Sequence, residues 1–280
     1  MRPIALSLVL VTTMIGPGTG QTRAPSPQPS AAAGRGPLSR VEQEQFLLTA
    51  RVSKVRAAKK GTAGTHSATL SDGVVTHEVS IQSIDESAAR FQTATRVEFN
   101  FRDYWGYNVA AYRLAVMLGL DMVPPSVARD LRGTKAAYTW WVDGVMMDEE
   151  ERVRSKRQPP DVVYWNAQNQ ILTVFDELIA NTDRNGGNML VDRQWKLWLI
   201  DHSRAFRTNE DLRNPVKLLH CDRALLAKLR TLTGEMLEVE LGAYLTTFEM
   251  QAVLKRRDKI VARITALGPG ALYDLRRPPS

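Results

Sequence analysis

Cysteine and histidine are scarce in this chain. Its 280 residues include a single cysteine, Cys221, and four histidines. One thiol excludes an internal disulfide, and we expect Cys221 to be a core or helix residue. The three histidines other than His202 share no zinc-ligand spacing, so a zinc site is not supported, and His202 is interpreted as a neighbour that orients Asp201.

The apolar segment at the N-terminus is too short to span a bilayer comfortably. It covers residues 4–15, follows a basic residue and precedes small residues that suit cleavage near Gly20. We therefore expect residues 1–20 to be a signal peptide, the protein to be exported to a bacterial periplasm or exterior, and no stable membrane span to remain after cleavage. Residues 21–41 are rich in Pro, Ser, Ala and Gly, which predicts a disordered linker.

The charge balance favours anionic ligands without selecting one. The formal net charge is +7 and the pI is about 9.6. Basic runs at 51–60 and 255–257 are interpreted as solvated faces, and no nucleic-acid motif accompanies them, so we expect no nucleic-acid partner. The hydrophobic fraction of 44% and the charged fraction of 24% are those of a globular protein with one large domain or two lobes.

Periodicity predicts a β-rich first half and a helical second half, an α+β chain. The Ser71-Asp72-Gly73 turn between alternating segments predicts a hairpin. Residues 148–157 are interpreted as surface or linker. The predicted strands are 46–52, 67–70, 74–82, 123–129 and 136–141, and the predicted helices are 102–118, one from 168 onward, 222–232, 235–244 and 249–267.

Three polar residues stand out in the second half. Asp183 and Asn188 are five positions apart, and Asp201 closes an apolar strand after a predicted hairpin of 189–191 and 195–200. This hairpin would bring Asn188 and Asp201 to one ion, since carboxylate and amide oxygens suit magnesium. The same turn-forming residues also occur in proteins with no such chemistry, so that alternative stays open.

These residues carry a resemblance to a known superfamily. The motifs are Asn181-Thr182-Asp183-Arg184 with Asn188, and Leu199-Ile200-Asp201-His202-Ser203-Arg204-Ala205-Phe206. They resemble the atypical kinases of the phosphatidylinositol 3/4-kinase, HipA-like and secretory-pathway type. The likeness is strong over 171–206, and weaker but collinear over 59–130.

The resemblance implies a two-lobed protein-kinase-like fold, with a β-rich N-lobe over 42–141 and a helical C-lobe over 142–280. It implies ATP and Mg²⁺ as cofactors, with Mn²⁺ as an alternative. In that arrangement Asp183 is the base or substrate-orienting acid, and Asn188 and Asp201 are the metal ligands. The phosphate loop falls on Gly61 and Gly64, beside Lys59 and Lys60, although a plain basic loop explains this stretch equally well.

Two positions depart from the pattern. The ATP-holding lysine falls at Gln82, and its helix glutamate partner falls at Asn108. Because both the lysine and the glutamate are replaced, no charged side chain is left buried without its partner. The two amides can instead hydrogen-bond to each other. Glu98 is a poorer substitute for the helix acid because it precedes the helix. Asn185 stands where the lipid kinases have His, which leaves proton transfer to Asp183.

Three functions fit these observations. The first is an exported phosphotransferase that uses a magnesium nucleotide to modify a hydroxyl of an unknown protein or small-molecule acceptor. The second is a pseudokinase that binds nucleotide or metal without turnover, which Gln82 and Asn108 favour. The third is an exported interaction scaffold with no nucleotide site.

Overall fold

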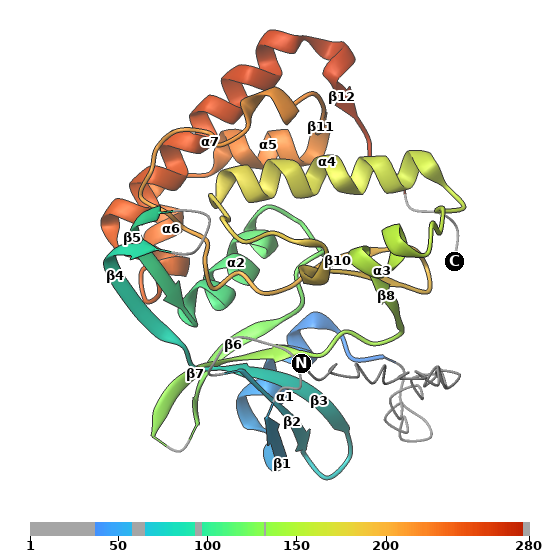
Figure 1. The fold of residues 1–280 in the computed structure, drawn as a ribbon, viewed down its shortest axis with the longest axis vertical. Coiled ribbons are helices and arrows are strands. Elements are labelled where there is room, and N and C mark those ends of the chain that lie inside the picture. Colours follow the sequence, from blue (N-terminus) through green and yellow to red (C-terminus); the bar gives the residue numbers. More distant parts are fainter. Residues whose placement is uncertain (1–36, 58–64, 93–96, 132, 277–280) are drawn as a thin grey trace, which may run out of the picture.

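A five-stranded antiparallel sheet forms the N-terminal part of the protein (Figure 1). The computed structural model describes residues 37–57, 65–92, 97–131 and 133–276. The predicted hairpin is present, with Asp72 accepting hydrogen bonds from two backbone amides of its turn and Gly73 at φ 92°. In spatial order the strands are β1 (Arg51–Ala57), β2 (Thr65–Ser71), β3 (Thr76–Gln82), β7 (Thr134–Trp140) and β6 (Ser126–Leu131).

A helix, α1 (Arg40–Thr49), occupies most of the segment 46–52 that was predicted as the first strand. That prediction was wrong because it followed the apolar residues and overlooked the start signal before them. Ser39 and Glu42 form a capping box, which fixes the helix start. Phe46 and Leu47 then cover the sheet as part of its buried core, and the strand begins only at Arg51.

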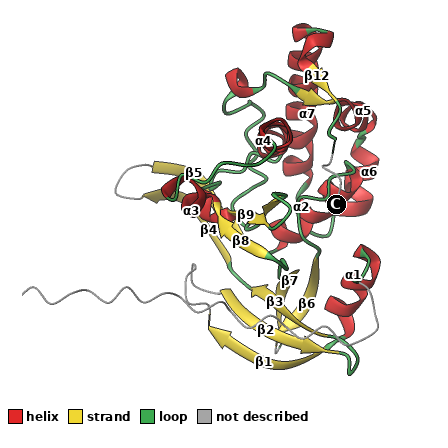
Figure 2. Cartoon of the chain, turned by 90° about the vertical axis from the view of Figure 1, so that its right-hand side faces the viewer, coloured by secondary structure: helices red, strands yellow, loops and turns green. Residues whose placement is uncertain are grey.

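A second hairpin, β4 (Asp85–Gln92) and β5 (Val97–Tyr104), projects from the sheet toward the helices (Figures 1 and 2). The sequence analysis did not predict it. Its residues 102–104 were assigned to the following helix, which in fact begins at Gly106. A Cβ at this glycine would clash with the Tyr104 ring, which would have to move to accommodate it.

The helix α2 (Gly106–Met117) is buried between the sheet and the C-terminal helices. Gly119, at φ 72°, follows its end as predicted. Residues 141–144 then lead into a small sheet of β8 (Val145–Asp148), β9 (Met189–Asp192) and β10 (Leu197–Leu199). The stretch interpreted as surface or linker contains a helix, α3 (Glu149–Arg154), whose N-cap is Asp148.

The C-terminal part is helical, as predicted (Figure 2). Its helices share one core with α2, β9 and β10, and Cys221 is fully buried in it. Among the described residues, no helix is both long and apolar enough to cross a membrane. The elements are α4 (Val162–Leu178), α5 (Arg223–Thr231), α6 (Gly234–Leu241), α7 (Thr247–Leu267), the 3-10 turns η1 (Gly186–Asn188), η2 (Pro215–Lys217) and η3 (Pro269–Ala271), and the short strands β11 (Cys221–Asp222) and β12 (Leu272–Tyr273).

A buried arginine of α7 ties this core together. Arg256 is 0% exposed, and its guanidinium donates to the carbonyl of Leu178 at 2.8 Å and to that of Arg207 at 2.8 Å. It also donates to the carbonyl of Asn209. Burial lowers the pKa of Arg256 to about 10, and the carboxylates of Glu177 and Glu210 oppose that shift. One side chain thus joins the end of α4 to the segment after Asp201.

We predict that Arg256→Leu lowers the free energy of unfolding by about 3 kcal/mol, because it strands buried carbonyls without donors. Lys255→Leu is the matched control: the residue is exposed on the same helix, so its effect should stay within about 0.5 kcal/mol. Urea unfolding followed by circular dichroism measures both. Equal effects of the two substitutions would contradict this role of Arg256.

Candidate active site

The predicted catalytic loop follows α4 directly. Asn181 is buried, and its side-chain oxygen accepts a hydrogen bond from the amide of Asp183 at 3.1 Å. This bond fixes the backbone just before the acid. The side chain of Asp183 is 40% exposed, so its carboxylate can meet a solvent-borne substrate.

Arg184, the residue after Asp183, is the centre of the site's hydrogen bonds. Its guanidinium makes a two-pronged ion pair with Asp176 of α4, at 2.9 and 3.1 Å. It also donates to the carbonyl oxygens of Asn188 at 2.9 Å and Ile200 at 2.8 Å. A fifth contact reaches Nε2 of His202 at 2.9 Å. One cation therefore connects the helix, the loop and both residues that flank Asp201.

His202 is fully buried and serves as an acceptor in this network. Burial, reinforced by the positive charge of Arg184, lowers its pKa well below the ordinary value. The imidazole is therefore neutral, and Nε2 accepts from Arg184. The imidazole thus contacts Arg184, and the role of His202 as an orienting neighbour of Asp201 stays a prediction.

The backbone segments that carry Asn188 and Asp201 lie side by side, because the amide of Ile200 donates a hydrogen bond to the carbonyl of Asn188 at 3.1 Å. Asp201 has φ 54°, an uncommon value for a residue with a side chain. Its Oδ1 accepts from Ser203 at 3.1 Å, whereas Nδ2 of Asn188 donates to the carbonyl of Asp183 at 3.4 Å. Within the described chain, Oδ1 of Asn188 and Oδ2 of Asp201 make no hydrogen bond, so two oxygens remain available.

These oxygens fit a magnesium or manganese ion that takes its other ligands from phosphates and water. The described residues contain no cluster of three or more His, Cys, Asp or Glu side chains that could hold a metal by themselves.

Gln82 and Asn108 form the amide pair that the sequence indicated. Both are buried, and Nδ2 of Asn108 donates to Oε1 of Gln82. The remaining oxygen of Asn108 accepts from the backbone amide of His202 at 2.8 Å. The pair therefore links β3 and α2 to the turn that carries Asp201.

Other predicted site residues have different positions. Lys59, Lys60, Gly61 and Gly64 lie outside the described residues, so their role stays a prediction. Asn185 is exposed and caps the 3-10 turn η1 by accepting from the amide of Gly187 at 3.0 Å.

Glu98 does not replace the helix acid, because it faces two arginines that follow Asp201. Its Oε2 accepts from Arg204 at 2.8 Å, and its Oε1 accepts from Arg207. The sequence analysis named neither arginine as a site residue.

Asp103 is a further carboxylate that the sequence analysis missed. It is 5% exposed at the end of β5, where the backbone amide of Tyr104 donates to the carbonyl of Ser203 at 2.9 Å. Burial raises its pKa, the Ser203 hydroxyl opposes the shift, and the charge of Asp201 adds to it. The alternation of Val97, Phe99 and Phe101 is a strand signal that was overlooked, and it would have placed Asp103 in β5 instead of in the following helix.

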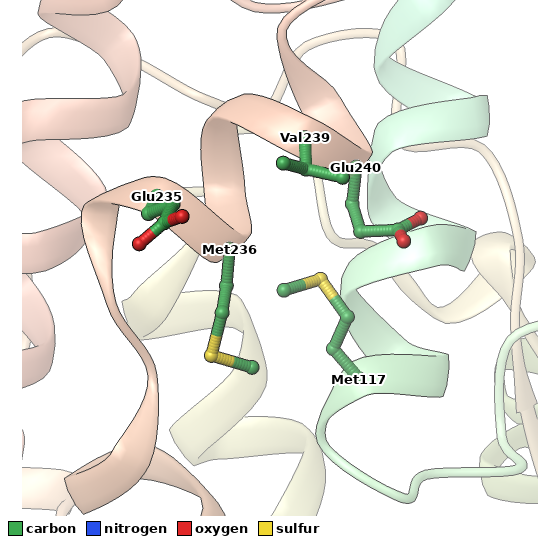
Figure 3. A pocket seen from close by; sticks show the side chains of 5 residues that line it. All are labelled: Met117, Glu235, Met236, Val239 and Glu240. Atoms are coloured by element: carbon green, nitrogen blue, oxygen red, sulfur yellow. The ribbon is translucent and has the colours of Figure 1, made fainter.

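The surface of the described chain has a larger cleft and a smaller groove. A cleft of about 760 Å³ lies between the β4–β5 hairpin and residues 206–213, and Thr182 lines it beside Asp183. A smaller groove of about 310 Å³ separates α2 from α6, where Met117 and Met236 point toward each other (Figure 3). Neither lining includes Asp183, Asn188 or Asp201, but the larger cleft reaches the residue before Asp183, whereas the smaller groove lies between α2 and α6.

We predict that Arg184→Lys lowers the free energy of unfolding by roughly 2 kcal/mol, because an ammonium cannot reproduce the five contacts of the guanidinium. Arg113→Lys is the control: its pair with Glu240 is exposed at 3.5 Å, so we expect a change of at most about 0.5 kcal/mol. Thermal and urea unfolding test both variants. A near-neutral Arg184→Lys would show that the network does not hold the loop.

Comparison with known proteins places this chain in a family. The model of the ABC1 atypical kinase-like domain matches residues 67–224, more than half of the chain. A search of curated proteins finds no match. The structure is similar to that of hydra Fam20 with sugar, at a TM-score of 0.63 and 13% identity over 84% of this chain and 92% of the other. It is also similar to the Golgi casein kinase with Mn and ADP bound, at a TM-score of 0.59 and 14% identity over 81% of this chain and 76% of the other.

At such identities the two likenesses show the fold. They confirm the two-lobed α+β kinase-like fold that the motifs predicted. The family match adds a name that the motifs did not supply. The chain belongs to the ABC1 atypical kinase-like family.

Proposed function

We propose that this protein is an exported atypical kinase-like phosphotransferase that uses a magnesium nucleotide to phosphorylate a hydroxyl of a protein or small molecule. The observation that carries the proposal is the Arg184 network, which brings the loop of Asp183 and Asn188 to the turn of Asp201. Export rests on the signal-peptide pattern of residues 1–20.

Asp183 is the proposed base. Its carboxylate is 40% exposed, so an acceptor hydroxyl can approach it, and the preceding residue, Thr182, lines the larger cleft. The acceptor oxygen forms a bond to the terminal phosphorus of the nucleotide as the bond to the departing diphosphate breaks. The hydroxyl proton passes to Asp183.

Asn188 and Asp201 would hold the metal, whose charge would offset that of the phosphate oxygens when bound. Their two available oxygens support this assignment. The Golgi casein kinase of similar fold has Mn and ADP bound, which agrees with a divalent ion and a nucleotide here.

A pseudokinase is the second candidate, and the Gln82–Asn108 hydrogen bond favours it. In ordinary kinases a lysine and a glutamate occupy these places, and the lysine contacts the nucleotide phosphates. The neutral pair here keeps the connection between β3 and α2 but offers the phosphates no cation. Binding without turnover would follow if Lys59 or Lys60 does not compensate.

We predict that the chain binds ATP with Mg²⁺ and that Asp201→Ala weakens this binding by at least about ten-fold. Mutating a residue that only hydrogen-bonds to a metal ligand typically lowers metal affinity at least ten-fold, so removing the ligand itself should cost no less. Asp211→Ala is the control: its exposed pair with Lys259 lies outside the site. Isothermal calorimetry measures all three proteins. No binding of ATP, ADP or GTP with either Mg²⁺ or Mn²⁺ would rule out the proposed cofactor.

We also predict that Gln82→Lys combined with Asn108→Glu tightens ATP binding by about ten-fold, because it restores a cation at the phosphates. The introduced glutamate still has an oxygen for the amide of His202, which Asn108 now supplies. Gln82→Lys alone should destabilise the protein, since it buries an unpaired charge. Turnover that appears only in the double variant would identify the native chain as a pseudokinase. Unchanged affinity would show that the phosphates lie elsewhere.

A further inference from the structure

A cluster of charges joins the β4–β5 hairpin to the segment after Asp201. Glu98 of β5 accepts from Arg204 at 2.8 Å and, through its other oxygen, from Arg207. All three side chains are mostly buried, at 15%, 16% and 12% exposed. Charges this sheltered interact far more strongly than pairs on the open surface.

The ring of Phe101 packs against both arginines of this cluster. The guanidinium carbon of Arg204 lies 4.9 Å from the ring centroid, and that of Arg207 lies 5.7 Å from it. Phe101 is itself 6% exposed and stacks on Phe91 at 4.1 Å. The hairpin therefore supplies both a carboxylate and an aromatic face to the two arginines.

Arg204 is held at its backbone as well. Its carbonyl accepts from the hydroxyl of Thr182 at 3.0 Å and from the amide of Thr182 at 3.4 Å. Its guanidinium then reaches Oδ1 of Asp183 at 3.4 Å. One residue thus contacts both Thr182 and Asp183 while its charge is anchored by Glu98.

We propose that Arg204 and Glu98 are positioning residues for Asp183, so that the β4–β5 hairpin sets the direction of the catalytic carboxylate. Arg204 fixes the carboxylate by direct contact, and Glu98 acts through Arg204. This inference rests on the proposed function for the role of Asp183 as base. It adds that the orientation of the Asp183 carboxylate depends on a hairpin of the N-terminal part.

The kinetic test uses Arg204→Gln and Glu98→Gln in the full chain. We expect kcat to fall by about ten- to a hundred-fold in each, the usual effect of a misplaced catalytic group. The KM for ATP should stay within about two-fold, because neither side chain is placed at the nucleotide. If Glu98 acts through Arg204, the double variant should be no slower than Arg204→Gln.

Two further variants separate positioning from general damage. Arg204→Lys keeps a positive charge within reach of Asp183 and should recover part of kcat. Asp85→Asn removes an exposed ion pair with Arg102, 3.1 Å long, on the same hairpin, and should leave kcat unchanged. A loss of kcat in Asp85→Asn equal to that in Glu98→Gln would overturn the proposal.

A second measurement does not need turnover. Thermal unfolding of Glu98→Gln, Arg204→Gln and their double variant, and the same cycle for Asp183→Asn with Arg204→Gln, should give non-additive shifts of Tm. Additive shifts in both cycles would overturn the proposal. If the wild-type chain transfers no phosphoryl group, the proposed function fails, whereas these cycles still decide whether Glu98, Arg204 and Asp183 act as one unit.

Discussion

The site depends on the ion pair and hydrogen bonds of the Arg184 guanidinium. Its pair with Asp176 fixes the guanidinium to the last turns of α4, and its other donors hold backbone or imidazole acceptors. An arginine can do this because its donors lie in one rigid plane. The pair is only 10% and 13% exposed, so water competes weakly for it. Together with the backbone hydrogen bond from Ile200 to Asn188, this side chain holds the segments of Asn188 and Asp201 next to each other.

Besides the backbone hydrogen bond from Tyr104 to Ser203, two side chains connect the N-terminal part to the site by separate routes. Asn108 extends from α2 to the amide of His202, and Glu98 extends from β5 to the arginines beyond it. The first route uses neutral groups and ends at the turn that carries Asp201. The second uses charges and ends at the acid. The two routes depend on different elements, so a change in one need not disturb the other.

Local patterns predicted much of the fold. The helices 222–232, 235–244 and 249–267 were found within a few residues, because apolar spacing and a capping box mark them in the sequence. Asn188 and Asp201 are joined by a short hairpin, which the sequence between them was enough to predict. Such features are set by residues near each other in the chain.

The remainder depends on long-range contacts that one sequence does not display. The hairpin of β4 and β5 was missed because β4 has no alternation of apolar residues, and the alternation of Val97, Phe99 and Phe101 in β5 therefore had no recognisable partner strand. Asp103 and Glu98 become site neighbours only through that hairpin. The motif marked Asp183 and Asn188, whereas the bonds that make Arg184 central reach to residues 176 and 202.

The contacts of Arg256 have a consequence for folding during synthesis, because the site's carbonyls precede in the chain the residue that binds them. The carbonyls that it satisfies belong to residues 178, 207 and 209, on both sides of the site, yet the cation itself belongs to the last long helix. During synthesis those carbonyls have no such partner until residue 256 has left the ribosome. Loss of the final helix would therefore remove the site's internal support even though every residue of the motif is still present.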